Sequence, residues 1–303
     1  MAAPQSPIGS RRRLGAELRR LRLKTGLTLD DVAAMMTCST SKISRLETGK
    51  AVPKVPDVGE LMRIYGVASD TERDMLLRLV KDGRQHGWWE SLTEGVAPQR
   101  FVMDVPSRYT ALETTASAVR SFELTILHGL LQIPEYTRAV IRTVLPGRPD
   151  DEIERLVRLR QGRQEALVRR DPPLELSVIL DEAVLRRVVS SPALMVDQLE
   201  ALREAARMPN VEVRVLTFDQ GFHRSHVGSF VVLEFPPDVG SDVVYMEGHA
   251  GDTYLENPAD VTLYKDVLSD VSLRANDPRG SMEIVDRYLA AYRNGDWKAP
   301  PGE

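Results

Sequence analysis

Hydrogen-bonding side chains gather in the segment STSKISRLETGK, residues 39–50, at spacings that fit a short helix. Ile43 and Leu46 lie three residues apart and mark its buried side. The side chains left facing outward are Thr40, Ser41, Lys42, Ser44 and Arg45. Arginine can donate two hydrogen bonds to guanine in the DNA major groove, and serine or threonine can bond either base type, at about 1–3 kcal/mol of discrimination per contact. The segment predicts base-edge chemistry; the plainer alternative is a polar helix face that only water contacts.

Residues 13–56 contain the elements that would position this helix. Leu14, Leu18 and Leu21, with the stem of Lys24, form one apolar stripe on a first amphipathic helix. Gly26 is a natural stop for that helix, and Thr28 is a suitable N-cap for a second one. The pattern is typical of a device that holds one helix in the major groove.

Two short helices joined by a tight polar turn follow the glycine. The second helix is expected to bury Val32, Ala33 and Met36, and Ser39 is expected to cap the third. Gly49 ends the third helix, and the prolines at 53 and 56 prevent its continuation. Further helices over residues 57–65 and 69–81 complete an all-α five-helix domain at residues 11–81.

These motifs carry a family resemblance. Residues 13–66, through "LRxxR", "GLT", "VA" and "ISRLETGK", resemble the lambda-repressor-like, XRE-type helix-turn-helix family. The resemblance implies a recognition helix at about 39–48 and a structural ion pair between Arg22 and Glu47. It implies base contacts by Thr40, Ser41, Ser44 and Arg45, and phosphate contacts by Ser39, Lys42, Thr48 and Lys50. Leu29 stands where the family often has glutamine, which weakens one expected phosphate contact.

The charge distribution agrees with a DNA-binding head. Residues 1–80 hold 14 Lys and Arg against 9 Asp and Glu, a net charge of +5, although the whole chain has a formal net charge of −4. The remainder is therefore acidic, with a net charge of −9. A basic module on an acidic body is the electrostatic pattern expected of a protein that binds DNA through one end.

Length and composition bound the remaining possibilities. A chain of 303 residues with 42% apolar residues is expected to form two domains with real cores. No apolar run is long enough for a membrane span, and residues 1–10 read as a disordered tail without a signal core. The single cysteine, Cys38, excludes an intramolecular disulfide and fits the reducing cytoplasm. Cys38 is interpreted as a small packed residue, with a redox switch as the alternative.

Residues 82–106 are expected to join the two domains. This segment mixes glycine, proline and polar residues with the adjacent pair Trp88 and Trp89. Side chains of that size are seldom left in water without reason. We expect them to pack one domain against the other, or to line a pocket.

The pattern changes from residue 107 onward, where strands alternate with helices. Short stretches rich in Val and Phe predict strands at 174–180, 211–218, 228–235 and 243–247. Helices are predicted at 109–123, 133–144, 150–170, 181–189, 194–207, 258–275 and 280–293. The fold class expected for residues 107–295 is α+β, a mixed sheet with packed helices. Residues 296–303 are expected to form a tail.

This second part also resembles a known family. The motifs "GLLQIPEY", "RLRQGRQEAL", "LDEAVLRR", "QLEALRE" and "PNVEVRVLTFDQG" resemble the DUF5753 domain of Scr1-type antitoxin-like regulators. The resemblance implies a transcription regulator, sometimes paired with a small DUF397-type protein, and no known enzymatic activity. We expect residues 107–295 to form its regulatory and dimerisation domain. Two positions depart from the family: His128 stands where proline is usual, and Ile133 where threonine is usual.

Motifs for catalysis are absent or weak. There is no P-loop, no G-x-G-x-x-G and no G-x-S-x-G. His223 and His226, with Glu247 and His249, could suggest a metal site, but H-x-x-H on a loop is a weak pattern and loop solvation explains it better. The arginine-rich helix ending near Arg170 could bind an anion, although Glu152, Glu154 and Glu165 favour a surface helix with ion pairs. No metal, cofactor or catalytic residue is predicted.

The sequence therefore predicts a cytoplasmic, sequence-specific DNA-binding transcription regulator. We expect a homodimer, because paired heads read two half-sites, and a second domain that senses a protein partner or a small-molecule effector. The alternative is an antitoxin-like protein that binds a small DUF397-type partner, with autoregulatory DNA binding.

Overall fold

The computed structural model describes residues 6–94, 108–170, 172–248 and 251–298. The chain divides into two compact units. The first contains Met1–Glu90, together with the short segments Ala111–Thr115 and Phe235–Ser241, and the second contains the rest. No described helix is both long and apolar enough to cross a membrane.

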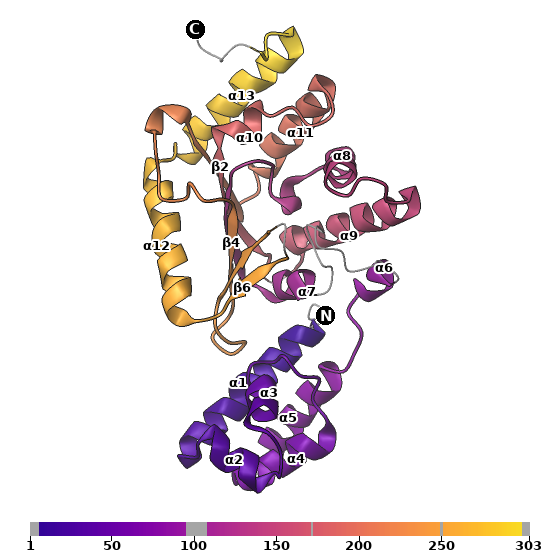
Figure 1. Ribbon diagram of the computed structural model, residues 1–303, viewed down its shortest axis with the longest axis vertical. Coiled ribbons are helices and arrows are strands. Elements are labelled where there is room, and N and C mark those ends of the chain that lie inside the picture. Colours follow the sequence, from indigo (N-terminus) through magenta and orange to yellow (C-terminus); the bar gives the residue numbers. More distant parts are fainter. Residues whose placement is uncertain (1–5, 95–107, 171, 249–250, 299–303) are drawn as a thin grey trace. The chain divides into compact units, whose positions relative to one another are not determined.

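Five helices form the first unit (Figure 1). They are α1 (Pro7–Thr25), α2 (Leu29–Met35), α3 (Thr40–Glu47), α4 (Val55–Ile64) and α5 (Asp70–Asp82). The five-helix prediction is confirmed, and the expected leucine stripe of α1 is fully buried with Val32, Ala33, Ile43 and Leu46 in one core. Lys24, expected to add to the stripe, is exposed in the last turn.

The first helix begins earlier than expected. Residues 7–10, assigned from the sequence to a disordered tail, form the first turn of α1. Pro7 lies at the start of the helix, where its fixed φ suits helical backbone and its missing N–H has no role. Gly9 and Ser10 are buried, so packing holds this turn in place.

The second unit is built on a mixed sheet, as predicted, with six strands where four were expected. The strands are β1 (Ala118–Glu123), β2 (Glu175–Asp181), β3 (Val211–Leu216), β4 (Phe230–Glu234), β5 (Val243–Met246) and β6 (Thr253–Leu255), in the order β3-β2-β1-β4-β5-β6. The first three are parallel, and β4, β5 and β6 join antiparallel. β1 therefore lies between a parallel and an antiparallel neighbour.

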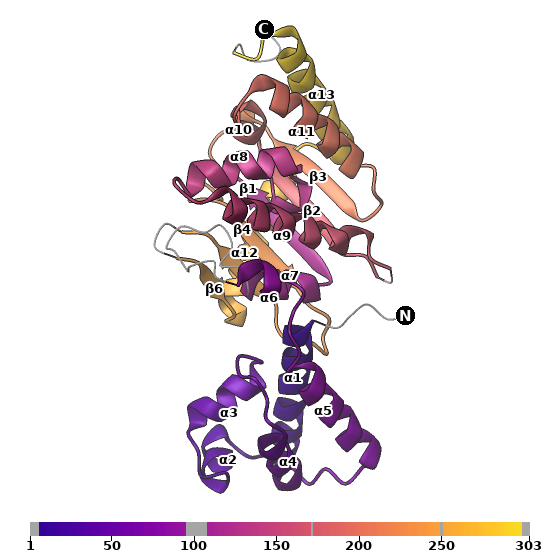
Figure 2. The same cartoon turned by 90° about the vertical axis from the view of Figure 1, so that its right-hand side faces the viewer.

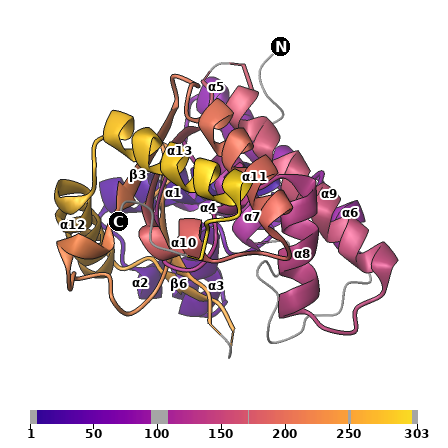
Figure 3. The ribbon, with the colours of Figure 1, turned by 90° about the horizontal axis from the view of Figure 1, so that it is seen from above.

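Helices cover both faces of this sheet. The helices that follow the first five along the described chain are α6 (Glu90–Thr93), α7 (Arg108–Thr115), α8 (Pro134–Val144), α9 (Asp150–Val168), α10 (Glu182–Arg186), α11 (Pro192–Ala205), α12 (Pro258–Arg274) and α13 (Pro278–Asn294), with short 3-10 turns η1 (Gly129–Leu131) and η2 (Phe218–Gln220). α12 lies on one face, and α8 and α9 cross the other (Figures 1 and 2). α13 runs beside α11, which Figure 3 shows from above.

One prediction for this unit was wrong, and one strand was not predicted. Residues 109–123 were expected to form one helix, but α7 ends at Thr115 and the rest is the central strand β1. Pairing on both sides, with Val119 and Phe122 fully buried, overrides the local helical pattern. The short edge strand β6 was not predicted.

The tryptophan pair and the tails can be described only in part. Trp89 is buried and Trp88 is 41% exposed, with their rings edge to face at 5.9 Å. Their expected role between domains stays a prediction, and residues 95–106 of the expected linker lie outside the described residues.

At the C-terminal end of the described chain, Trp297 stacks on Tyr292, so the expected tail is packed at that residue.

Candidate nucleic-acid interface and a cavity in the second unit

Local hydrogen bonds fix the two helices of the expected DNA-binding motif. Thr28 caps α2 through a reciprocal pair of bonds, in which its N–H donates to Asp31 and the Asp31 N–H donates to its hydroxyl, at 2.8 and 3.1 Å. The Ser39 hydroxyl accepts a bond from the Lys42 N–H at the start of α3. Both predicted caps are confirmed. Cys38, between the helices, packs partly buried against the core.

A buried ion pair ties α3 to α1. Arg22 Nε and Nη2 donate to the two carboxylate oxygens of Glu47 at 2.7 and 2.9 Å, and both side chains are less than a tenth exposed. Arg22 Nη1 also donates to the Leu27 carbonyl at 2.9 Å. The bonds to Glu47 raise the pKa of Arg22. The structural role predicted for this pair is confirmed.

The backbones of α1 and α3 also approach each other closely, at Gly15 of α1. A Cβ on Gly15 of α1 would lie 2.5 Å from the Glu47 carbonyl oxygen and 2.6 Å from that of Leu46. Only glycine therefore fits where α1 crosses the end of α3. Gly15 was not among the predicted residues, although a glycine inside an otherwise regular helix is a signal of such a close approach.

The predicted DNA-contacting residues lie along α3 and at its two ends. Ser41 and Arg45 are exposed, Ser44 is half-buried, and the Arg45 side chain has no hydrogen bond or ion pair within the described chain. Ile43 and Leu46 point into the core instead. The exposed side chains are therefore separated from the packing side, as the spacing predicted.

Several of these side chains bond to neighbours in the free protein. The Thr40 hydroxyl donates to Asp30 of α2 at 2.6 Å, and Lys42 Nζ pairs with Asp57 of α4 at 2.8 Å. The Thr48 hydroxyl donates to the Ser44 carbonyl. Lys50 is exposed just beyond the helix. The carboxylates of Asp30 and Asp57 would compete with DNA for Thr40 and Lys42.

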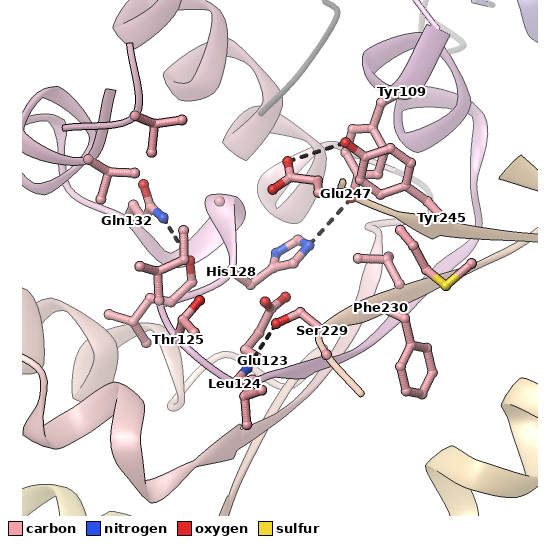
Figure 4. A pocket seen from close by; sticks show the side chains of 18 of the residues that line it. Tyr109, Glu123, Leu124, Thr125, His128, Gln132, Ser229, Phe230, Tyr245 and Glu247 are labelled. Carbon is pink, nitrogen blue, oxygen red and sulfur yellow. Dashed lines mark hydrogen bonds between the residues drawn. The ribbon is translucent and has the colours of Figure 1, made fainter. Parts of the chain in front are cut away.

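The second unit contains a cavity of about 860 Å³ between the sheet and the helices beside it. Its walls include apolar side chains of the β1–η1 loop, α8 and β4, among them Leu124, Ile126, Leu127, Val140, Val144 and Val231. Polar groups converge at one part of it. Figure 4 shows Glu123, His128 and Glu247 pointing into the same space, with Tyr109 and Tyr245 beside them.

Secondary structure places each of these polar groups. Glu123 ends β1, and Glu247 follows β5. His128 caps η1, because its Nδ1 accepts a bond from the Leu130 N–H at 3.3 Å, and its Nε2 lies 3.5 Å from the Tyr109 hydroxyl. The position at which His128 departs from the family pattern is therefore on the cavity wall.

Glu123 is the most perturbed acid of this group. The residue is 7% exposed, and burial, with a smaller contribution from the Glu247 carboxylate, raises its pKa to about 8. A titratable group shifted this far inside a cavity is a candidate for binding or catalysis. Sequence reasoning did not select Glu123 because it expected this residue at the end of a helix.

Helix α9 differs in part from the surface helix that was expected. Arg138 pairs with Glu154, and Arg155 with Asp151, as a surface helix with ion pairs requires. Arg160 and Arg163, however, are buried and line the cavity. Arg160 Nη1 donates to Gln132 Oε1 at 2.7 Å, and Arg163 lies over the Tyr109 ring at 4.9 Å.

The histidine loop gives no metal-binding arrangement. His226 Nδ1 lies 3.3 Å from the His223 carbonyl oxygen, and the His223 ring packs edge-on against Phe122. No group of three or more potential metal ligands occurs among the described residues. His249, named with them from the sequence, lies outside the described part.

Comparison with known families matches both halves of the chain. A family model described as a helix-turn-helix domain matches residues 13–76, and the model of a domain of unknown function, DUF5753, matches residues 106–287. No curated protein and no solved structure matches the chain. The helix-turn-helix match supports a DNA-binding regulator in general. The chain thus belongs to the DUF5753 family, with an XRE-type helix-turn-helix domain preceding the DUF5753 domain.

Proposed function

We propose that this protein is a sequence-specific transcription regulator that acts in the cytoplasm and inserts α3 into the DNA major groove. Thr40, Ser41, Ser44 and Arg45 would read base edges, and Ser39, Lys42, Thr48 and Lys50 would contact phosphates. The observation that carries the proposal is the Arg45 side chain, exposed on a helix whose opposite side is fixed by the buried Arg22–Glu47 pair. A rigid helix with an available guanidinium is what direct readout of guanine requires.

The charges around α3 favour this surface. The basic character of residues 1–80 supplies the sequence-independent attraction to phosphate. Contacts to phosphates set position and contacts to base edges set sequence preference. Lys42 and Arg45 are therefore expected to have separable effects on DNA binding.

We further propose that the protein binds DNA as a homodimer and that the DUF5753 domain supplies the dimer contact. A single α3, eight residues long, touches few base pairs. Two heads spaced by one helical turn of DNA, about 34–36 Å, double the site. The expected operator is an inverted repeat with half-sites at that spacing. Sedimentation that finds only monomer at micromolar concentration would count against the dimer.

The DUF5753 domain is also proposed to sense a small molecule. The cavity of about 860 Å³ falls within the range usual for small-molecule sites, about 300–1,000 Å³. Its mostly apolar wall with a few convergent polar groups is typical of such sites. This cavity favours an effector over a DUF397-type protein as the signal, because its volume and its few convergent polar groups suit a small molecule.

Selection of genomic DNA fragments by the purified full-length protein tests the DNA-binding role. The wild type is expected to enrich a few sites that contain an inverted repeat. Arg45→Ala is expected to weaken binding roughly 5- to 150-fold for each half-site contacted, and to relax preference at one base pair of each half-site. Lys42→Ala is expected to weaken binding to all sequences similarly and to reduce its salt dependence.

Arg63→Ala is the matched control, because Arg63 is an exposed arginine of the same unit that pairs with Glu60 on α4. Its binding should equal that of the wild type. Absence of enriched sites, or equal enrichment by Arg45→Ala and wild type, would overturn sequence-specific recognition by α3.

A further inference from the structure

A buried carboxylate without a cationic partner lies on the wall of the cavity. Glu123 is 7% exposed, and no lysine or arginine of the described residues lies close enough to form an ion pair with it. The charged group that acts on it is the Glu247 carboxylate. Buried acids in proteins are normally paired or held neutral, because an isolated buried charge is costly. With its pKa raised to about 8, Glu123 is held largely neutral near pH 7, and a ligand that brings a positive charge beside it would favour the ionised form.

A second carboxylate, that of Glu247, lines the same cavity. Glu247 is exposed and accepts a hydrogen bond from the Tyr245 hydroxyl at 3.2 Å. Figure 4 shows this carboxylate directed toward the space that Glu123 faces. Two carboxylates at different depths attract a cation and repel an anion.

Aromatic rings supply the rest of a cation-binding surface. Tyr109, Phe230, Tyr245 and Tyr264 all line the cavity. The rings of Tyr109 and Tyr245 lie 4.4 Å apart, and those of Phe230 and Tyr264 lie 4.9 Å apart. Aromatic faces attract ammonium groups, and they pack against apolar ligands through the same faces. Arg163 already lies over Tyr109, so a cation is tolerated beside these rings.

The two buried arginines do not argue for an acidic ligand. Arg160 donates to Gln132, and Arg163 is stacked on Tyr109, so each already has a partner of its own. Glu123, in contrast, lacks a cation in the described part of the chain. Glu123 is therefore the group on the cavity wall with which a cationic ligand could form a new ion pair.

We propose that the cavity binds a small organic amine, with its ammonium group against Glu123 and its apolar or aromatic body along the aliphatic and aromatic walls. This assignment rests on the effector-sensing role proposed above and names the chemical class of the effector. The cavity volume suits a molecule of drug size and exceeds what a simple alkylamine would fill.

Titration calorimetry of the full-length protein with three matched probes tests the assignment. The probes are 2-(2-naphthyl)ethylamine, 2-(2-naphthyl)ethanol and 2-naphthylacetic acid, which share an apolar body and differ in the charge of the head group. The amine is expected to bind at least tenfold more tightly than the alcohol and the acid. Glu123→Gln should remove that advantage and leave alcohol binding unchanged. Tightest binding of the acid, or full amine affinity in Glu123→Gln, would overturn the proposal.

A second pair of variants avoids dependence on the buried substitution. Thr143 is exposed on α8 and lines the cavity, whereas its neighbour Arg142 is exposed and does not line it. Thr143→Trp is expected to reduce amine binding tenfold or more because the larger side chain would occupy part of the cavity, and Arg142→Trp is expected to leave amine binding unchanged. Equal binding by both variants would place the amine elsewhere and overturn the proposal.

The calorimetry contains no DNA, so it tests amine binding separately from the regulatory function. A second measurement compares DNA affinity with and without the amine. If the amine binds but DNA affinity does not change, the cavity assignment is supported and only the sensing role is refuted. Loss of DNA binding in Arg45→Ala with intact amine binding would likewise support the assignment, because the two sites lie in different units.

Discussion

Replacing Arg22 with methionine should destabilise the helix-turn-helix domain strongly, because it leaves the Glu47 carboxylate buried without its partner. Arg22 makes two hydrogen bonds to that carboxylate and one to the Leu27 carbonyl. Bonds to charged groups contribute about 1.5–3 kcal/mol each, and breaking a buried ion pair from one side costs about 3–5 kcal/mol. Whole domains are stable by only about 5–15 kcal/mol. The expected loss of about 3–5 kcal/mol is therefore a large share of the total.

Hydrogen exchange of the full-length protein, followed by mass spectrometry, measures this loss within the first unit alone. Amides of α1, α2 and α3 that exchange through opening of the whole domain should exchange roughly 100- to several-thousand-fold faster in Arg22→Met. Peptides from the β1–β2–β3 region should be unaffected.

Arg20→Met provides the matched control on the same helix. Arg20 pairs with Glu17 and Glu72, but its side chain is 51% exposed, and exposed pairs contribute only about 0–1 kcal/mol. The double variant Arg22→Met with Glu47→Leu should recover most of the stability, because no uncompensated charge remains. Equal exchange rates in Arg22→Met and Arg20→Met would refute a large contribution of the buried ion pair to stability. A double variant as unstable as Arg22→Met alone would show that Arg22 contributes through its packing and not through its charge.

Two further predictions concern backbone contact and buried charge. Gly15→Ala should destabilise the first unit by about 1–3 kcal/mol, because its Cβ would meet the backbone of α3. Gly59 lies in α4, where an added Cβ meets nothing within 4 Å, so Gly59→Ala should instead stabilise the first unit by about 0.5–1 kcal/mol. Hydrogen exchange of the first unit should therefore be faster in Gly15→Ala and slower in Gly59→Ala. A change in the same direction in both variants would contradict this prediction. In the second unit, the folded-state pKa of Glu123 is raised to about 8 from an unfolded value of about 4.3, so the folded state holds the proton more tightly and stability should fall as pH rises between these values. Urea unfolding should give a free energy of unfolding that is lower at pH 8.5 than at pH 5.5, by on the order of a few kcal/mol in the wild type and by less in Glu123→Gln. Equal losses in the two proteins would show that Glu123 is not the group responsible.

Most of the first unit could be predicted from the sequence because its determinants are local. The caps at Thr28 and Ser39 act within three residues, and the buried stripe of α1 repeats at helical spacing. The partners of Thr40 and Lys42 could not be predicted in this way. Asp30 and Asp57 reach them from other helices, and only the packing of α2 and α4 brings those carboxylates within bonding distance.

The cavity could not be predicted, because its polar groups come from separate parts of the chain. Tyr109, Glu123, His128, Arg160 and Glu247 share no motif and no common spacing. Only two features of the sequence point to it indirectly. One is the departure at His128, and the other is an arginine-rich helix that is consistent with either an anion site or surface ion pairs.

The error at residues 109–123 and the failure to select Glu123 have one physical cause. A helix through this segment would give Glu123 no defined relation to residues 247 or 128. As the last residue of a strand paired with β2 on one side and β4 on the other, Glu123 is held at the edge of the sheet where the β1–η1 loop begins. Pairing with Leu180 fixes its register, and burial then raises the cost of its charge. Long-range strand pairing, which periodicity does not encode, thus determines both the fold at the centre of the sheet and the acid proposed to bind the effector.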